Sequence, residues 1–213
     1  MKLSSVFGCL LAGAATSAAL PAENSARSVA DLVTSKITWT GQVKPGEASV
    51  SITGTAGEIY EQIVGINPNY DSELGLDSAN STVQRRDLNH IGKRATTSSD
   101  YTCDYGNDVI AERVGDGVRY LYSIANGDCS APPGSPGNGG CTTTTCNSGA
   151  GIFLCNDSSN TINIHCSLIA DNAVEVLIMC QRSTYSGANT WTTNTHGQIF
   201  STDRSWNVIL NRC

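Results

Sequence analysis

The chain has 213 residues and a formal net charge of −6, and 39% of its residues are hydrophobic. This length allows one or two domains. From Ala95 to the C-terminus there are ten aspartates or glutamates, five arginines and no lysine, a balance of −5. Because such a surface repels phosphate groups, we expect no nucleic-acid partner and no insertion into an anionic membrane.

The first residues have the pattern of an export signal. Lys2 gives a positive start, residues 6–15 (VFGCLLAGAA) are apolar, and Ala19 is a small residue suited to a cleavage site. The apolar run is too short to span a bilayer. We therefore expect residues 1–19 to be a signal peptide and the protein to be secreted. A buried N-terminal helix is the alternative.

Residues 20–94 contain the pattern of a small strand–strand–helix (β-β-α) unit. Alternating apolar residues predict strands over 36–43 and 48–53, with the turn KPGE between them. Thr55 and Glu58 fit a capping box, which predicts a helix that ends before Asn67-Pro68. The unit has no cysteine, and a unit of this size without a crosslink is not comfortably stable alone.

Two basic pairs, Arg85-Arg86 and Lys93-Arg94, follow in a polar segment. A kexin-type protease of the secretory pathway reads such pairs, so we expect cutting after Arg86 and Arg94. Residues 20–94 would then be a propeptide, which we interpret as a folding aid or mask. Residues 95–213 would be the mature domain. The alternative is an uncut linker between two domains.

Cysteine use changes at the same point in the chain. Cys9 lies in the expected signal peptide, and the other eight cysteines all follow Arg94. An even number in a secreted chain predicts four disulfides, and oxidising conditions disfavour the alternative of zinc thiolates. We expect no metal and no cofactor. The cysteines are Cys103, Cys129, Cys141, Cys146, Cys155, Cys166, Cys180 and Cys213.

The cysteine-rich part has a mixed pattern of helices and strands. Cys166 and Cys180 lie fourteen residues apart, close to four helical turns, so both point to the apolar side of one helix, which can be fixed at both ends. The predicted elements in order are a helix over 115–125, a Pro/Gly loop over 131–140, strands over 141–146 and 150–155, a helix over 162–180, and a closing hairpin of 197–202 and 206–213.

This order of parts carries a family resemblance. The strand CNSGAGIFLC (146–155), the helix HCSLIADNAVEVLIMC (165–180), the pair Gly197-Gln198 and the ending NVILNRC are its motifs. Over residues 115–213 the chain resembles the secreted, calcium-channel-blocking killer toxins encoded by viruses of the corn smut fungus. The layout of signal, propeptide and mature part also resembles small secreted fungal effectors.

The resemblance implies an α+β fold: an α/β sandwich whose antiparallel sheet of about five strands carries two helices on one face. It implies disulfides between Cys146 and Cys213, and between Cys166 and either Cys129 or Cys141. It also implies a toxin that acts on other cells from outside. The family's activity is associated with a lysine in the loop before the middle strand. Residues 131–145 contain no basic residue here, so we carry over the fold and the cell-acting role, with a cell-surface protein or glycan as partner.

A secreted hydrolase of the ribonuclease type is an alternative. General acid–base catalysis would need two groups at one centre, and His165 and His196 are the candidates. The other interpretation of His165 is a cap or surface residue at a helix start, and that of His196 is an exposed turn residue. We find no nucleophile elbow, phosphate loop, zinc-binding histidine pair or nicotinamide motif. We therefore expect a protein without catalytic activity.

A glycan- or protein-binding module is the third possibility. Tyr185 and Trp191 lie among small polar residues, as aromatic residues of binding surfaces often do. Trp191 could instead belong to the core, as we expect for Trp206. Asn80 and Asn156 begin glycosylation sequons. We expect Asn156 to mark the solvent edge of a strand.

Overall fold

The computed structural model describes residues 33–76, 100–135, 140–185 and 190–213. The expected signal peptide with Ala19, the cutting sites Arg86 and Arg94, and the sequon at Asn80 lie outside these ranges. The described residues form an α+β fold with four helices and two sheets, one of nine strands and one of three. The α+β class expected from the sequence is confirmed.

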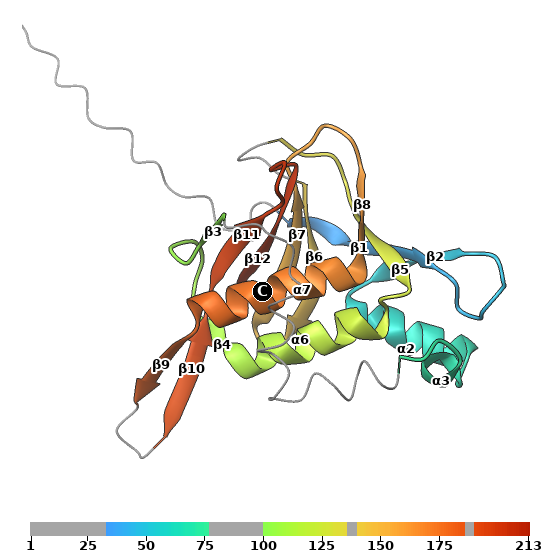
Figure 1. Ribbon diagram of the computed structural model, residues 1–213, viewed down its shortest axis with the longest axis horizontal. Helices are drawn as coiled ribbons and strands as arrows, with labels where there is room; N and C mark the ends of the chain where they lie inside the picture. The colour runs from blue at the N-terminus through green and yellow to red at the C-terminus, as the bar shows by residue number, and fades with distance from the viewer. Residues whose placement is uncertain (1–32, 77–99, 136–139, 186–189) are drawn as a thin grey trace, which may run out of the picture.

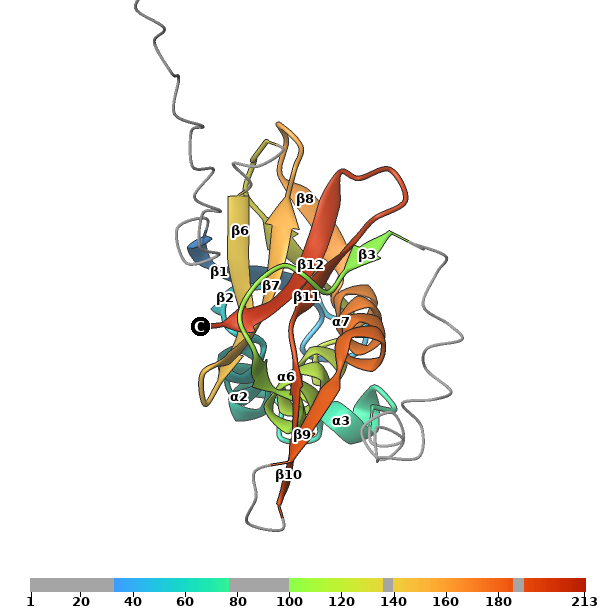
Figure 2. The same cartoon turned by 90° about the vertical axis from the view of Figure 1, so that its left-hand side faces the viewer.

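The cysteine-rich region contributes most of the elements. The helices α6 and α7 lie side by side on one face of the large sheet (Figures 1 and 2). The elements are β3 (Tyr101–Thr102), β4 (Val109–Ile110), α6 (Ala111–Ser123), β5 (Gly127–Ala131), β6 (Gly140–Asn147), β7 (Ala150–Asn156), β8 (Ile162–His165), α7 (Cys166–Cys180), β9 (Arg182–Tyr185), β10 (Trp191–Thr195), β11 (Gly197–Phe200) and β12 (Trp206–Arg212).

The N-terminal region supplies β1 (Val33–Gly41), β2 (Val50–Gly54), α2 (Ala56–Ile66) and the short α3 (Tyr70–Glu73). The capping box is present: Thr55 Oγ1 accepts a hydrogen bond from the Glu58 amide, and Glu58 Oε2 accepts one from the Thr55 amide. The helix ends at Ile66, and Asn67 is its C-cap. The predicted strand, strand and helix are therefore all present.

The large sheet differs from the antiparallel sheet of about five strands that the resemblance implied. Its order is β3-β11-β12-β7-β6-β1-β5-β8, with β2 paired to β1. The run from β3 to β6 is antiparallel throughout, but β1 pairs parallel with β6 and antiparallel with β5. The sheet is larger and mixed because β1, which lies outside the residues covered by the resemblance, joins it.

The strands and helix of the N-terminal region share a core with the cysteine-rich region and do not form a core of their own. Trp39 on β1 is fully buried, and its Nε1 donates a hydrogen bond to the Ile124 carbonyl at 2.9 Å. Ile59 and Ile63 on α2 are also fully buried, in the same core cluster as residues of α6 and α7. Burying such side chains stabilises a fold by about 1.5–3 kcal/mol each. One core serves both regions.

The eight cysteines after Arg94 form four disulfides: Cys103–Cys180, Cys129–Cys166, Cys141–Cys155 and Cys146–Cys213. The Cys146–Cys213 pair and the Cys129 partner of Cys166 agree with the pairings that the resemblance implied. The helix α7 is fixed at both ends, as its cysteine spacing predicted. It begins at Cys166 rather than Ile162, because residues 162–165 pair with β5 as β8.

Candidate functional site

The β9–β10 hairpin extends away from the body of the molecule, beyond the ends of α6 and α7 (Figures 1 and 2). Near its tip the backbone register places Trp191 opposite Tyr185. Their ring centroids are 5.2 Å apart with the planes tilted by 52°. The exposed fractions are 69% for Trp191 and 52% for Tyr185. This pair, the aromatic tip, includes Trp191, the most exposed large hydrophobic side chain among the described residues.

The strand pattern explains why these rings are uncovered. Side chains alternate along β10, so Trp191 lies on the same face of the strand as Thr195, which is fully buried opposite Val109. The same face is therefore part of the core at its root and exposed at its tip. The sequence alone allowed two positions for Trp191, in the core or on a binding surface. The structure places its side chain at the surface.

Small hydroxyl side chains continue the aromatic tip toward the body. Ser183 and Thr193 face each other across the hairpin, with their oxygens 3.1 Å apart. Among the described strands, β9 pairs only with β10, so its other edge is not part of a ladder. Aromatic rings beside hydroxyl groups and a free strand edge can bind a peptide segment or a sugar.

The two candidate histidines do not converge. His165 precedes α7, and its Nδ1 lies 2.7 Å from Ser167 Oγ. His196 pairs with Asp108, with Nδ1 and Oδ1 2.7 Å apart. Its neighbour Gly197 packs against Cys180, at the opposite end of the same helix. A helix of 15 residues is about 22 Å long, so these histidines cannot act on one reacting centre.

A second feature, the seam pocket, lies between the N-terminal region and the cysteine-rich region. It is a cavity of about 690 Å³. Its wall includes Lys36 and Glu58 from one side and Tyr120, Phe153 and Arg212 from the other. The mixture of aromatic rings and charges suits a small polar molecule. Sequence reasoning missed this pocket, because it exists only where two distant segments meet.

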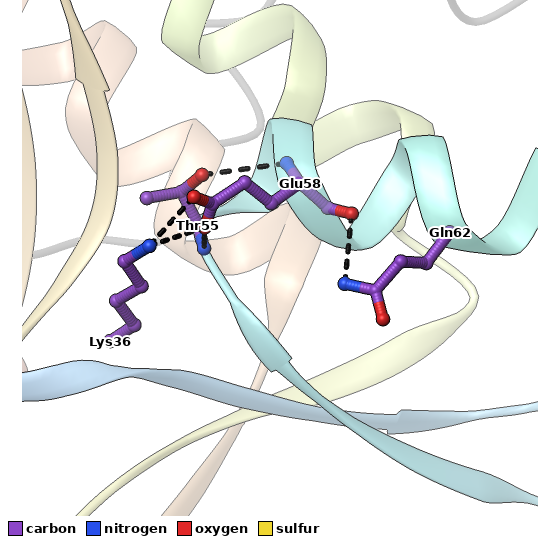
Figure 3. Close-up of polar contacts among 4 residues, drawn as sticks. All are labelled: Lys36, Thr55, Glu58 and Gln62. Atoms are coloured by element: carbon purple, nitrogen blue, oxygen red, sulfur yellow. Dashed lines mark hydrogen bonds and ion pairs between the residues drawn. The ribbon is translucent and has the colours of Figure 1, made fainter.

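Two charged side chains in the wall of the seam pocket, Lys36 and Glu58, form an ion pair. Lys36 Nζ lies 2.6 and 2.8 Å from the two carboxylate oxygens of Glu58 (Figure 3). The hydrogen bond from Lys36, followed by that from the Thr55 amide, lowers the pKa of Glu58 below its usual value. Gln62 Nε2 donates to the Glu58 carbonyl one turn earlier on α2. Glu58 therefore joins the helix cap to β1, a role beyond the capping box that the sequence indicated.

Asn156 does not lie at a solvent edge, and that prediction is wrong. Its side chain is fully buried, and Nδ2 donates hydrogen bonds to the carbonyls of Pro132 at 2.8 Å and Asn160 at 2.7 Å. Its Oδ1 accepts from the Ser158 amide. A glycan on Nδ2 is incompatible with these contacts. Asn156 instead fixes two neighbouring loops to the end of β7.

Across residues 33–76, 100–135, 140–185 and 190–213, no three side chains of His, Cys, Asp or Glu gather as metal ligands. In those ranges, no helix has the length and apolar character needed to cross a bilayer. Four disulfides are typical of proteins from extracellular compartments.

Comparison of the chain with protein-family models, with curated proteins and with solved structures gives no match.

Proposed function

We propose that the protein is a secreted, non-catalytic toxin- or effector-like protein that acts on other cells from outside, by binding a surface protein or glycan through the aromatic tip. The observation that carries this proposal is the exposed contact between Tyr185 and Trp191 on a projecting hairpin. Tryptophan and tyrosine are the residues on which binding energy most often concentrates. Four disulfides stabilise the body behind the hairpin for use outside the cell.

Acidic charge and fixed shape support the same proposal. With a balance of −5 after Arg94, the surface disfavours attraction to anionic lipids, so recognition depends on shape and on uncharged contacts. The aromatic tip offers both, since its neighbours Ser183 and Thr193 carry hydroxyl groups. Two paired strands also hold the rings with little freedom to lose on binding.

The test is binding of labelled protein to intact fungal and plant cells. We expect Trp191→Ala to weaken binding about 30-fold, the effect of removing a dominant contact of about 2 kcal/mol. Tyr185→Ala and Tyr101→Ala form a matched pair, because both tyrosines are exposed but only Tyr185 belongs to the tip. Tyr185→Ala is expected to weaken binding and Tyr101→Ala to leave it unchanged. Equal binding by wild type and Trp191→Ala would contradict the proposal.

Further experiments identify the class of partner and test the proposal that the protein is not a catalyst. Treating the cells with protease or with glycosidases shows whether a protein or a glycan is bound. RNA cleavage by the purified protein that disappears in His196→Ala would instead support the hydrolase alternative. Growth inhibition that external calcium reverses would indicate the channel-directed action of the toxin family.

A further inference from the structure

The N-terminal region and the cysteine-rich region share a sheet without sharing a crosslink. Residues 33–76 contain no cysteine, and the four disulfides all join residues between Cys103 and Cys213. The only covalent connection between the regions is therefore the backbone of residues 77–99. That segment carries both basic pairs, Arg85-Arg86 and Lys93-Arg94. Whether a cut there separates the regions depends on non-covalent contacts alone.

The backbone contacts of β1 are those of an inner strand. Along the sheet it lies between β6 and β5, and β2 pairs with it as well. Side chains add hydrogen bonds across the boundary: Ser130 Oγ donates to the Thr38 carbonyl at 3.1 Å, and Asn126 Nδ2 donates to the Gln42 carbonyl at 2.7 Å. Loss of β1 would leave unpaired ladder groups on both β6 and β5, which natural sheets avoid.

The side-chain contacts of the N-terminal region are those of a core. Trp39, Ile63 and Tyr70 are all fully buried. The Tyr70 hydroxyl donates to Asn126 Oδ1, and the ring of Tyr60 on α2 lies 6.4 Å from that of Tyr120 on α6. Gly127 on β5 has no room for a side chain, because a Cβ there would lie 2.3 Å from Trp39 Nε1. The cysteine-rich region is shaped around Trp39.

We propose that residues 33–76 are a permanent subunit of the secreted molecule. Hydrolysis of the peptide bond after Arg86 or Arg94 by a kexin-class protease consumes one water and leaves a carboxylate on that arginine and an amino group on the next residue. The product is a two-chain protein in which β1, β2 and α2 stay in place, rather than a free domain of residues 95–213. The seam pocket, with Lys36 on one chain and Arg212 on the other, is then a site built by both chains.

The test uses the full chain secreted from a yeast that has its own kexin protease. A denaturing gel of the secreted protein is expected to show two pieces. In native buffer, both pieces are expected to elute together from gel filtration, at the position of the uncut protein. Mass spectrometry of that peak is expected to identify both pieces. A single secreted chain would overturn the proposal, and so would a fragment containing residues 33–76 that elutes separately.

A matched pair of substitutions shows what holds the pieces together. Ile63 and Ile66 lie on the same helix, but Ile63 is fully buried whereas Ile66 is 59% exposed. In the cut protein, Ile63→Ala is expected to speed loss of the N-terminal piece on dilution at least tenfold, and Ile66→Ala to leave it unchanged. If Ile63→Ala is not secreted, Tyr70→Phe removes the hydroxyl bonded to Asn126 and is expected to speed the loss several-fold. Equal loss rates in wild type and Tyr70→Phe or Ile63→Ala would contradict the interlocked arrangement.

Discussion

The two described regions of the molecule are held by different means. Residues 100–213 carry four disulfides, each worth about 2–4 kcal/mol in a chain of this kind. Residues 33–76 carry none, and they are held by strand pairing and by buried side chains such as Trp39 and Ile63. The crosslinked region is nevertheless incomplete by itself, because the strand between its β6 and β5 comes from the other region. The disulfides are therefore confined to residues 100–213, whereas the hydrophobic core also includes residues 33–76.

The largest expected effect comes from removing the side chain that joins the two regions. Trp39→Ala leaves a cavity at a fully buried position and removes the hydrogen bond to Ile124. We expect it to lower the free energy of unfolding of the full chain by about 3–5 kcal/mol, measured by urea unfolding with the disulfides intact.

The control is the exposed tryptophan of the aromatic tip. Trp191→Ala is expected to change the free energy of unfolding by no more than about 0.5 kcal/mol, because no packed core is lost at this position. If Trp39→Ala splits unfolding into two transitions and leaves the later one at the wild-type midpoint, the two regions are independent and the shared core is disproved.

A smaller loss of stability is expected from a substitution at Gly127, which lies against Trp39. In Gly127→Ala, the new Cβ would lie 2.3 Å from Trp39 Nε1 and 2.7 Å from the Thr40 carbonyl oxygen. The backbone oxygen cannot move away freely, so overpacking is expected to destabilise the protein by about 1–3 kcal/mol in the same urea assay.

Gly115→Ala is the matched control for this substitution. Gly115 lies inside α6 and has no neighbouring atom within 4 Å of an added Cβ. Alanine there is expected to stabilise the helix by up to about 1 kcal/mol. The same change of residue should therefore act in opposite directions at the two glycines. Stabilisation by Gly127→Ala would show that β1 yields easily and that the two regions are only loosely joined.

Local patterns predicted much of the fold. The capping box of Thr55 and Glu58, the strand alternation around Trp39 and the cysteine spacing along α7 depend on neighbours within a few residues, so they could be read from the sequence. The pairing of β1 with β6 and β5 could not, because an alternating strand has the same pattern whichever sheet it joins.

The candidate sites show the same limit. Asn156 has the sequence of an exposed sequon, yet its hydrogen bonds reach Pro132 in a loop far away in the chain. The aromatic tip could be named from its composition, but only the exposure of Trp191 excluded its place in the core. The seam pocket has no signal in either of the segments that form it.

The smallest expected effect concerns pH and distinguishes the two regions by sign. In the N-terminal region, the pKa of Glu58 is lowered in the folded protein by the hydrogen bonds from Lys36 and the Thr55 amide. Its stabilising contribution is therefore present above the ordinary pKa of 4.5 and is lost as the pH falls through the lower folded value. In the cysteine-rich region, burial raises the pKa of Glu175, whose Oε2 has no hydrogen-bond partner in the described structure. Its charged form destabilises the fold at neutral pH, and this destabilisation disappears as the pH falls through the raised value.

Urea midpoints measured at about pH 3, 5 and 7 should separate these two contributions. Glu58→Gln is expected to lower stability at neutral pH by less than about 1 kcal/mol, because the ion pair with Lys36 is half exposed. Its difference from wild type should vanish at the acid end. Glu175→Gln is expected to raise stability slightly at neutral pH and to match wild type once Glu175 is protonated. If both substitutions shift the urea midpoint at neutral pH in the same direction, the prediction is contradicted. The ion pair of Glu58 would then not stabilise the fold, or the burial of charged Glu175 would not destabilise it.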